Sequence, residues 1–554
     1  MSNALPVLSL LVAATTVSAA APIAPEPQPP RDPGALTILA EIALERGDCK
    51  GASEYYLEAV QQADASLAQR ATSVALACEH LPAAWQAAQR LRTLSPQDAD
   101  AAAVYAAVAL KLYRISDAQA AIRVVLQGAD REPRLAELTS LLLDGAEAPA
   151  VLGAISGAVD EATASPAVLT LLSELALNGY DFGRSERYAQ KALEKDPKIF
   201  EAQSLLSQVY AKQGDAAKAL AAAKAASELD AKRGTFETAQ ALITLDRAAE
   251  AREELERIRA SNEGFSAEVD RRLALLALQG NDFEEARKRF LALATAPNGA
   301  DTAMFYLAEL DALQGDQEKA LAGYRRLLGT SVGPTARTRA AELLLERGSR
   351  GEALKLLDDY AADHPESAFE LTMTKAHLLA DHGEPDSGLA LVAAALGEHP
   401  KHPTLEYDRA VLLESAGKVR ESVHALEQLL EERPEDPTVL NALGYTLADH
   451  GMRLPYAESL IRRALAVTPD NPAVVDSLGW VRFKRGDSRG AAKLHARAYA
   501  LSRDSEIAAH WGEALWKSGD KAQARQVWSS ALALDPDSKA LQTVIGRFIP
   551  VKKP

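Results

Sequence analysis

The sequence predicts an all-α chain, arranged as a superhelical solenoid of antiparallel helix pairs that spans nearly its whole length. Three observations lead to this fold. Apolar residues recur with helical period between short turn signals. One unit repeats about every 34 residues. The chain of 554 residues is also longer than a single compact core allows, and its aromatic share of only 5% disfavours strands.

The repeat is clearest in residues 438–537, which we expect to form the most regular units. A large residue followed by Gly recurs there three times, as Leu443-Gly444, Leu478-Gly479 and Trp511-Gly512. An Ala follows each pair at a similar distance, as Ala457, Ala491 and Ala524. Two short helices cross closely only where small residues face each other, which explains both positions. The period and residue order resemble the tetratricopeptide repeat (TPR), and this resemblance implies a right-handed superhelix with a continuous concave surface.

The N-terminal end indicates export. Residues 1–21 resemble a signal peptide, because an apolar run from Leu5 to Val17 precedes small residues. No Lys or Arg precedes that run, so an apolar leader on a cytoplasmic protein is the alternative. Residues 22–34 are rich in proline and predict an extended tether. The first cysteine is Cys49, so none stands directly after the apolar run, where a lipid would be attached.

The remaining chain divides by how well it fits the repeat. We expect TPR-like repeats in residues 35–130 and a degenerate helical segment that bends the array in residues 131–165. Central repeats are expected in residues 166–437, where Gly-containing turns separate amphipathic segments. Residues 538–554 are interpreted as a capping segment and a basic tail. About fifteen helix pairs follow from this division.

The two cysteines, Cys49 and Cys78, fall near the turns of the first two repeats, which would be stacked neighbours. A disulfide between them is possible and would require an oxidising compartment. The sequence leaves open whether they are bridged or free. Two cysteines cannot form a disulfide scaffold or a tetrahedral metal site.

Charge and motifs exclude several classes of function. The net charge of −16 argues against nucleic acid and anionic membranes as partners. No stretch reaches the ~20 apolar residues of a membrane span. The sequence has no phosphate-binding loop, no nucleophile elbow and no His-Glu-x-x-His motif, and its ten histidines are scattered singly. We therefore expect no enzyme, no cofactor and no metal, and we expect proteins as partners.

TPR proteins usually hold a ligand along the concave face, which the first helix of each repeat lines. Residues three before, one after and four after its small residue follow one helical stripe. We select ten candidates on this basis: Phe305, Met373, Tyr407, Asn441, Tyr445, Asp476, Trp480, Phe483, Glu513 and Trp516. Aromatic residues are common anchors of interaction surfaces. For Trp480 and Trp516, packing between repeats is an equal alternative.

The runs LNALGYTLAD, VVDSLGWVRFKRGD and AAHWGEALWKSGD in the last repeats resemble a group of bacterial envelope TPR proteins. Its best understood members are outer-membrane lipoproteins, adaptors that bring peptidoglycan hydrolases to a periplasmic carboxyl-terminal processing protease. The resemblance implies a non-enzymatic scaffold that is periplasmic or associated with the outer membrane. This chain departs from the group in lacking the lipid-attachment Cys. The alternatives are an assembly subunit of an envelope export or polysaccharide-secretion machine, or a hydrolase or transferase, for which the array leaves no room.

Overall fold

The structure is a computed structural model that describes residues 32–62, 64–127, 131–261, 266–296, 299–364, 367–535 and 538–549. These residues form helices and no strand, so the predicted all-α solenoid is confirmed. The expected signal peptide, most of the expected tether and the end of the basic tail lie outside the described residues. Pro33 and Gly34, which the sequence assigned to the tether, belong to the first helix, which begins at Pro33. The Asp32 carboxylate caps this helix by accepting a hydrogen bond from the Ala35 N–H (3.0 Å).

The helices of the N-terminal half follow each other in pairs. Their bounds are α1 Pro33–Glu45, α2 Cys49–Val60, α3 Ala65–Ala77, α4 Leu81–Leu94, α5 Ala99–Lys111, α6 Ile115–Val125, α7 Arg131–Leu143, α8 Ala148–Ala158, α9 Pro166–Asn178, α10 Phe182–Lys195, α11 Phe200–Lys212, α12 Ala216–Leu229, the short 3₁₀ turn η1 Arg233–Phe236, α13 Glu237–Thr244 and α14 Ala248–Ala260.

The C-terminal half continues the same succession. Its helices are α15 Ser266–Gln279, α16 Phe283–Ala294, α17 Ala300–Leu313, α18 Gln317–Arg326, α19 Gly333–Glu346, α20 Arg350–Asp363, α21 Ala368–Asp381, α22 Pro385–Glu398, α23 Pro403–Ser415, α24 Val419–Glu432, α25 Pro437–Asp449, α26 Leu454–Val467, α27 Pro472–Lys484, α28 Ser488–Leu501, α29 Ser505–Ser518, α30 Lys521–Leu534 and α31 Lys539–Phe548.

Each odd-numbered helix up to α29 packs on the even-numbered helix that follows it, and α31 covers the last pair. The weakest pairing is between α7 and α8, since α8 packs mainly on α6 and α9. These two helices make up most of residues 131–165, the segment in which the sequence departs from the repeat. The solenoid therefore continues through this segment, although one of its pairs is loose.

Close helix crossings explain the small residues of the repeat. A Cβ on Gly444 would lie 2.5 Å from a side-chain carbon of Ile461, and one on Gly512 would lie 2.0 Å from Nε1 of Trp528. Glycine in the first helix therefore makes room for a large side chain in the second. That side chain is fully buried, as in Trp528 with 1% exposure. Burial of such a side chain between helices contributes on the order of 2–3 kcal/mol, so each crossing stabilises its repeat.

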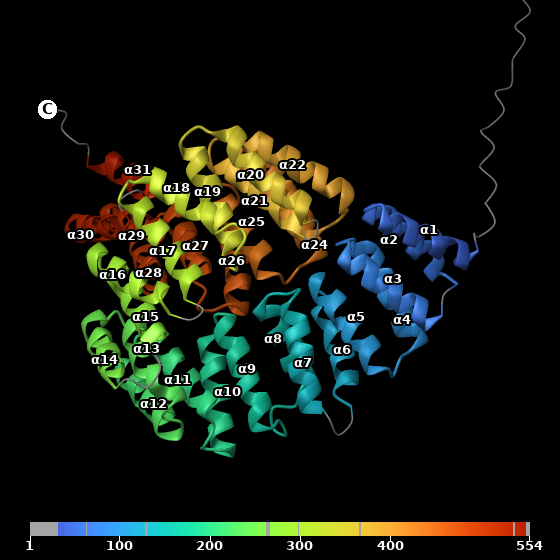
Figure 1. Cartoon of the computed structure of the whole chain (residues 1–554), viewed down its shortest axis with the longest axis horizontal. Helices are drawn as coiled ribbons and strands as arrows, with labels where there is room; N and C mark the ends of the chain where they lie inside the picture. The colour runs from blue at the N-terminus through green and yellow to red at the C-terminus, as the bar shows by residue number, and fades with distance from the viewer. Residues whose placement is uncertain are drawn as a thin grey trace, which may run out of the picture.

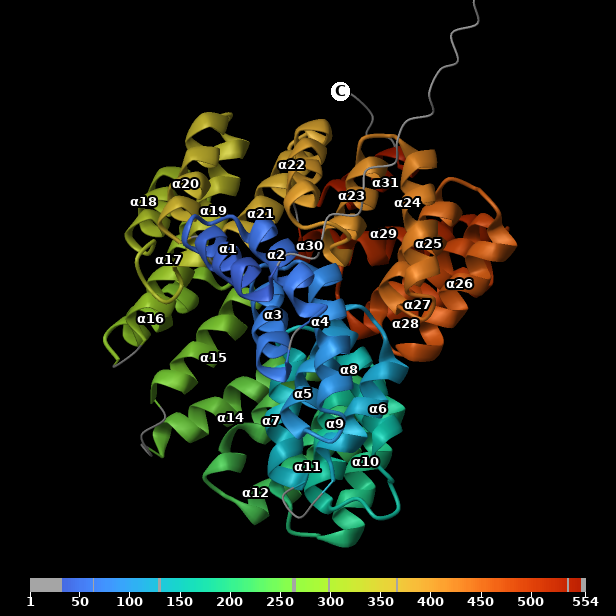
Figure 2. The same ribbon diagram turned by 90° about the vertical axis from the view of Figure 1, so that its right-hand side faces the viewer.

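The solenoid curves until its N-terminal repeats meet its C-terminal third (Figure 1). The turned view also shows α1 and α2 beside α21 and α22 (Figure 2). We call this contact the seam. On the N-terminal side it comprises residues 50, 78–79, 111–113, 147, 180–182 and 246, and on the C-terminal side residues 397–408, 433–441, 470 and 503. It joins turns within the early repeats to the connections between the later repeats.

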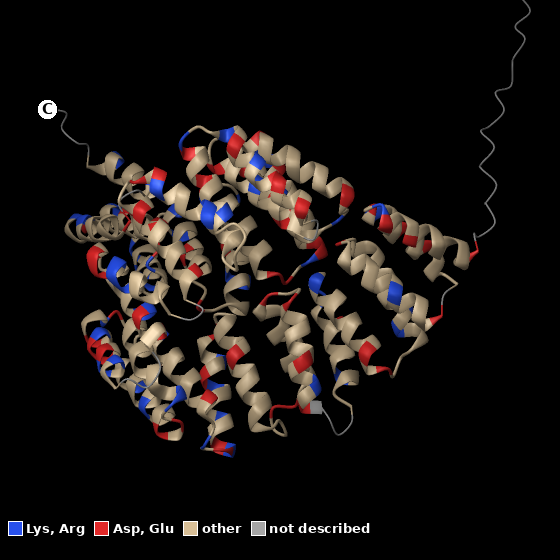
Figure 3. Ribbon diagram, in the orientation of Figure 1, with Lys and Arg blue, Asp and Glu red and all other residues tan. Residues whose placement is uncertain are grey.

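Hydrogen bonds and ion pairs follow the seam along its length. Lys50 Nζ donates to the Gly397 carbonyl (2.9 Å), and the Asp470 N–H donates to the Tyr180 carbonyl (2.9 Å). Arg503 pairs with Asp246 at 2.9 Å. The partners lie 347, 290 and 257 residues apart in the sequence, so one superhelical turn rests on the next. Elsewhere, acidic and basic residues are interspersed over the helices without a block of one sign (Figure 3).

Candidate functional site

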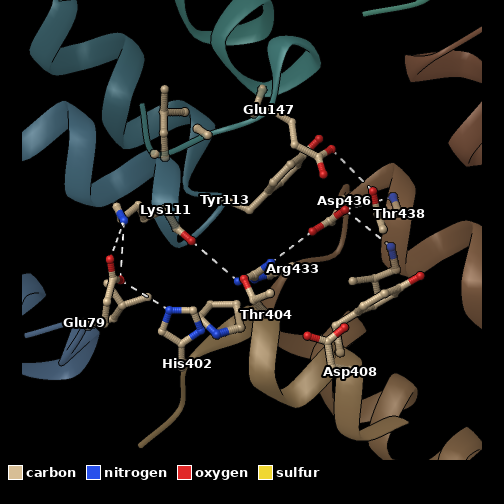
Figure 4. A pocket seen from close by; sticks show the side chains of 18 residues that line it. Glu79, Lys111, Tyr113, Glu147, His402, Thr404, Asp408, Arg433, Asp436 and Thr438 are labelled. Carbon is tan, nitrogen blue, oxygen red and sulfur yellow. Dashed lines mark hydrogen bonds and ion pairs between the residues drawn. The ribbon is translucent and has the colours of Figure 1, made fainter. Parts of the chain in front are cut away.

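The middle of the seam encloses a cavity of about 350 Å³ between α5, α8, α23 and α25. Polar side chains from both sides point into it (Figure 4). Glu79 accepts from Lys111 (3.2 Å) and pairs with Nε2 of His402 (3.3 Å). Thr438 Oγ1 donates to Glu147 (3.4 Å). Both early turns are thus tied to later helices by their own side chains.

Burial and neighbouring charges shift the pKa values of two carboxyl groups in this cavity in opposite directions. Burial alone would raise the pKa of Glu79, but the hydrogen bond from His402 and the charge of Lys111 lower it overall. Burial and the nearby Asp436 raise the pKa of Glu147. Burial also raises the pKa of Tyr113, whose buried hydroxyl has no hydrogen-bond partner. The seam therefore contains groups that respond to pH in different ways.

The backbone at the seam differs from that of the other repeats. Most turns within a repeat place Gly at a positive φ, where no side chain would meet a neighbour, as at Gly214 and Gly315. Five of the seven described non-glycine residues at positive φ lie at the seam, namely Glu79, Tyr113, Tyr180, Asp246 and Lys401, whereas Asn281 and Arg453 lie away from it. Such a conformation costs a residue with a side chain on the order of 1 kcal/mol or more. The five strained residues of the seam lie where a side chain or a carbonyl contacts the next turn of the superhelix.

Two sequence-predicted binding residues lie at the seam. Tyr407 lines the seam cavity and a second cavity of about 510 Å³ beside it, and Asn441 lines the second one. Burial raises the pKa of Tyr407 to about 12. The Oδ1 atom of Asn441 is buried without a hydrogen-bond partner. Both residues therefore face the N-terminal half of the same chain.

Three other predicted residues lie together near the C-terminal end. Trp480, Phe483 and Glu513 line a cavity of about 480 Å³ between α25, α27, α29 and α31, which we call the C-terminal pocket. Its remaining lining residues are Asp449, Lys484, Glu506, Ala509, His510, Lys539, Ala540, Thr543, Val544 and Arg547. Charged groups of both signs surround its aromatic floor. Of these, α31 supplies Lys539 and Arg547, which the concave stripe did not include.

Trp480 is the most constrained residue of the pocket, with 7% of its surface exposed. Its Nε1 donates to Asp449 (3.0 Å), and Lys484 Nζ lies 4.7 Å from its ring centroid. The ring stacks on Phe483 (5.2 Å) and on His510 (4.1 Å). Trp480 thus forms a fixed wall of the pocket, whereas half-buried Phe483 is accessible. Glu513 is buried 3.4 Å from the exposed guanidinium of Arg547.

Asp476, a further predicted residue, lies in a buried cluster with two histidines. Its Oδ1 atom lies 2.6 Å from Nδ1 of His495, and its Oδ2 atom lies 2.7 Å from Nδ1 of His510. Burial would raise the pKa of Asp476, but the hydrogen bonds from both imidazoles lower it strongly. The cluster does not form a sequence motif, because its members come from α27, α28 and α29. Its only local signal is a His four residues after Ala491, where other repeats have Phe290, Tyr324 or Trp528.

The last four predicted residues contribute mainly to packing. Phe305 contacts Tyr306 and Tyr324, and Met373 is buried beside α22 and α23. Tyr445 packs among the residues of α25–α27, and burial raises its pKa. Trp516 stacks with Trp528 and Phe548. They are therefore spread along the array and do not form one surface with the C-terminal pocket.

The structure pairs Cys49 with Cys78 in a disulfide, with a Cα–Cα distance of 5.3 Å. The bridge ties the start of α2 to the end of α3. The Cys78 carbonyl also accepts a hydrogen bond from Nδ1 of His399 across the seam (3.0 Å). The bridge therefore lies next to the contact between superhelical turns.

Tetratricopeptide-repeat family models match residues 379–444 and, in overlapping stretches, 170–234, 236–301 and 271–334. None of these families is catalytic. A TPR repeat-containing protein of Pseudomonas aeruginosa, PA4667, is 32% identical over 218 residues, which cover 38% of this chain and 36% of that protein. A probable biofilm formation methyltransferase of the same organism, WspC, is 33% identical over 109 residues, or 20% of this chain and 26% of that protein. The chain thus spans about a third or less of the length of these curated relatives.

Solved structures are similar at lower identity. A thermophilic TPR protein of Thermus thermophilus is 23% identical, with a TM-score of 0.30, over 31% of this chain and 95% of that one. A Cut9–Hcn1 hetero-tetramer structure matches at 14% identity and a TM-score of 0.31 over 93% of this chain and 96% of that one. Within the described residues, no helix is both long enough and apolar enough to cross a membrane.

Proposed function

Because the chain is a tetratricopeptide-repeat protein, we propose that it works as a non-enzymatic protein-binding scaffold in the bacterial cell envelope. Proteins of this repeat act as scaffolds for protein interaction. The observation that carries the proposal for this chain is the C-terminal pocket, where the accessible ring of Phe483 meets Lys484, Glu506, Lys539 and Arg547. An aromatic anchor inside a polar rim is the usual composition of a protein interaction site.

The shape of the pocket suits an extended segment of a partner. One aromatic side chain of a partner can stack on Phe483, while charged side chains can pair with the rim. Trp480 is already held by Asp449, Phe483 and His510, so it would not need to reorganise when a partner binds. Tyr407 and Asn441 are half-buried and line cavities at the seam, so a partner would contact them there together with residues of the early repeats.

The envelope location has two supports. The N-terminal residues resemble a signal peptide. The Cys49–Cys78 disulfide is a bond that persists in oxidising compartments such as the bacterial periplasm. The resemblance of the last repeats to adaptor lipoproteins makes the carboxyl-terminal processing protease and peptidoglycan hydrolases the first partners to test.

The experiment measures binding of the purified full chain to the processing protease and to a peptidoglycan hydrolase from the same envelope. We expect Phe483→Ala to weaken binding at least tenfold, because truncation of a central anchor typically costs about 2 kcal/mol or more. Leu291→Ala is the matched control, since Leu291 is 54% exposed on α16, far along the chain from the pocket. Unchanged affinity of Phe483→Ala would rule out the pocket as the docking site.

A second measurement identifies the class of partner that contacts the pocket at Lys484. Photo-crosslinking from position 484 in intact cells should capture either the protease and hydrolases or the components of an export machine. Capture of outer-membrane channel components in place of the protease would favour an assembly subunit over an adaptor.

A further inference from the structure

We propose that Asp476, His495 and His510 form a binding site for one divalent transition-metal ion, of which Zn²⁺ best suits this ligand set. One carboxylate oxygen and two imidazole nitrogens are ligands that Zn²⁺ takes in proteins. The proposal does not depend on the proposed scaffold function.

The three side chains come from three successive helices, and their ligand atoms all lie within 4.8 Å of one another. Asp476 and His510 occupy the first helices of neighbouring repeats, while His495 comes from the helix between them. All three have less than a tenth of their surface exposed. A ligand set on packed helices is held in place before an ion arrives, which favours a specific site.

The charge of the cluster also favours an ion. Asp476 is 5% exposed, and in the described part of the chain its ion pairs are those with His495 and His510, with neither Lys nor Arg as a partner. Buried charges in proteins are normally paired or bound to metal. A divalent cation would take the place of the protons through which the two imidazoles contact the carboxylate.

His495 is completely buried, and a buried polar ring needs a polar partner. Its Nδ1 atom faces Asp476, whereas its Nε2 atom, at the other edge of the ring, has no hydrogen-bond partner among the described residues. Packing does not require a polar ring here, because Phe290, Tyr324 and Trp528 fill the same position in other repeats.

Helix α27 also leaves room for the imidazole of His495. A Cβ on Gly479 would lie 2.6 Å from Cε1 of His495, so only glycine leaves the imidazole its place. On binding, the imidazole nitrogens and the carboxylate donate lone pairs to the ion, and any proton on those nitrogens passes to solvent. The contacts of 2.6 and 2.7 Å would widen to admit an ion at about 2.0–2.2 Å from each ligand atom. No electron is transferred.

The test titrates the full chain, without a polyhistidine tag, with Zn²⁺ by calorimetry and with Co²⁺ by visible absorption. We expect the chain to bind one equivalent of either ion. The Co²⁺ absorption spectrum should be that of an ion with a low coordination number. Asp476→Asn and His510→Gln should each weaken binding at least tenfold, with unchanged circular dichroism. His424→Gln is the matched control, because His424 is exposed on α24. Absence of stoichiometric binding, or equal affinity in a folded Asp476→Asn variant, would overturn the proposal.

A second measurement, tryptophan fluorescence, leaves the three metal-ligating side chains unchanged. The Trp480 ring lies 4.1 Å from the His510 ring, so Co²⁺ at this site should quench the fluorescence of Trp480. Trp480→Phe should reduce the quenched fraction, leaving the quenching of Trp511, Trp516 and Trp528 on α29 and α30, and should keep one-equivalent binding. An undiminished quenched fraction in Trp480→Phe would place the ion elsewhere and contradict the proposal. Phe483→Ala should keep full metal affinity, which separates this test from that of partner binding.

Discussion

At the scale of single residues, the distance between two packed helices decides at which positions only glycine fits. Gly388 occupies the small position of α22, where other second helices carry Ala. A Cβ on Gly388 would lie 2.5 Å from the carbonyl oxygen of Ala376, whereas one on Gly397 in the same helix would meet nothing within 4 Å. The clash at Gly388 is with backbone, which cannot rotate away. Only the first of these glycines is required by packing.

We therefore expect opposite effects from the same substitution within α22. Gly388→Ala should lower the free energy of unfolding by about 1–3 kcal/mol, because α21 and α22 must move apart. Gly397→Ala should raise it by up to about 1 kcal/mol, because alanine restricts the unfolded chain and favours helix. Urea unfolding followed by circular dichroism measures both. Equal effects of the two variants would show that the crossing at Gly388 is looser than described.

At the scale of elements, the first two repeats depend on the bridge between α2 and α3. Cys49 and Cys78 are separated by 29 residues, and closing a loop of that size stabilises a folded unit by about 3–4 kcal/mol in the chain-entropy account. The chain has no other cysteine, so reduction affects this unit directly.

Reduction of the full chain should increase amide hydrogen exchange in α1–α4 and leave α25–α30 unchanged. The Cys49→Ser/Cys78→Ser variant should show the same pattern without a reductant. Exchange near His399 should also rise, because the Cys78 carbonyl accepts its hydrogen bond. If α1–α4 exchange equally in both redox states, the bridge contributes nothing to these repeats.

At the scale of the whole molecule, a contact could be predicted from the sequence only where its two residues lie close together along the chain. The helix pairs follow from residues within one repeat, such as Gly512 and Trp528, so their period is visible in the sequence. The seam depends on pairs such as Glu79 and His402, which lie 323 residues apart. Its local sign is a residue other than Gly at the turn position, as in Glu79, Tyr113, Tyr180 and Asp246, although Asn281 takes this position in a repeat away from the seam. Small rotations between repeats add up over many units, and no single repeat reveals the sum.

The seam has a further consequence for the concave-face residues. Tyr407 and Asn441 satisfy the stripe rule of an open solenoid, yet they line cavities against Glu147 and Tyr180 of the early repeats. The stripe rule places a residue on a helix face, but it cannot say which other superhelical turn covers that face. The lining of the C-terminal pocket includes no described residue of the early repeats, and there Phe483 is half-buried.

The titratable groups of the seam predict a dependence of its stability on pH. The pKa of Glu147 is raised above 4.5, so the folded chain binds its proton more tightly, and this group favours the closed seam as pH falls toward that value. Burial lowers the pKa of His399, so its protonation in the same range opposes this gain. The pKa of Glu79 is lowered below 4.5, so its ion pairs with Lys111 and His402 should be lost as pH falls further, and the seam should open at low pH.

Small-angle scattering across this range measures the opening as an increase in the radius of gyration at low pH. Glu147→Gln should remove the gain between neutral pH and about 4.5, because this amide cannot titrate, and should keep the acid opening. Glu79→Gln should weaken the seam already at neutral pH, because an amide cannot balance the charge of Lys111. A radius that is independent of pH in the wild type, together with an unchanged radius in Glu79→Gln, would mean that these carboxylates do not hold the superhelical turns together.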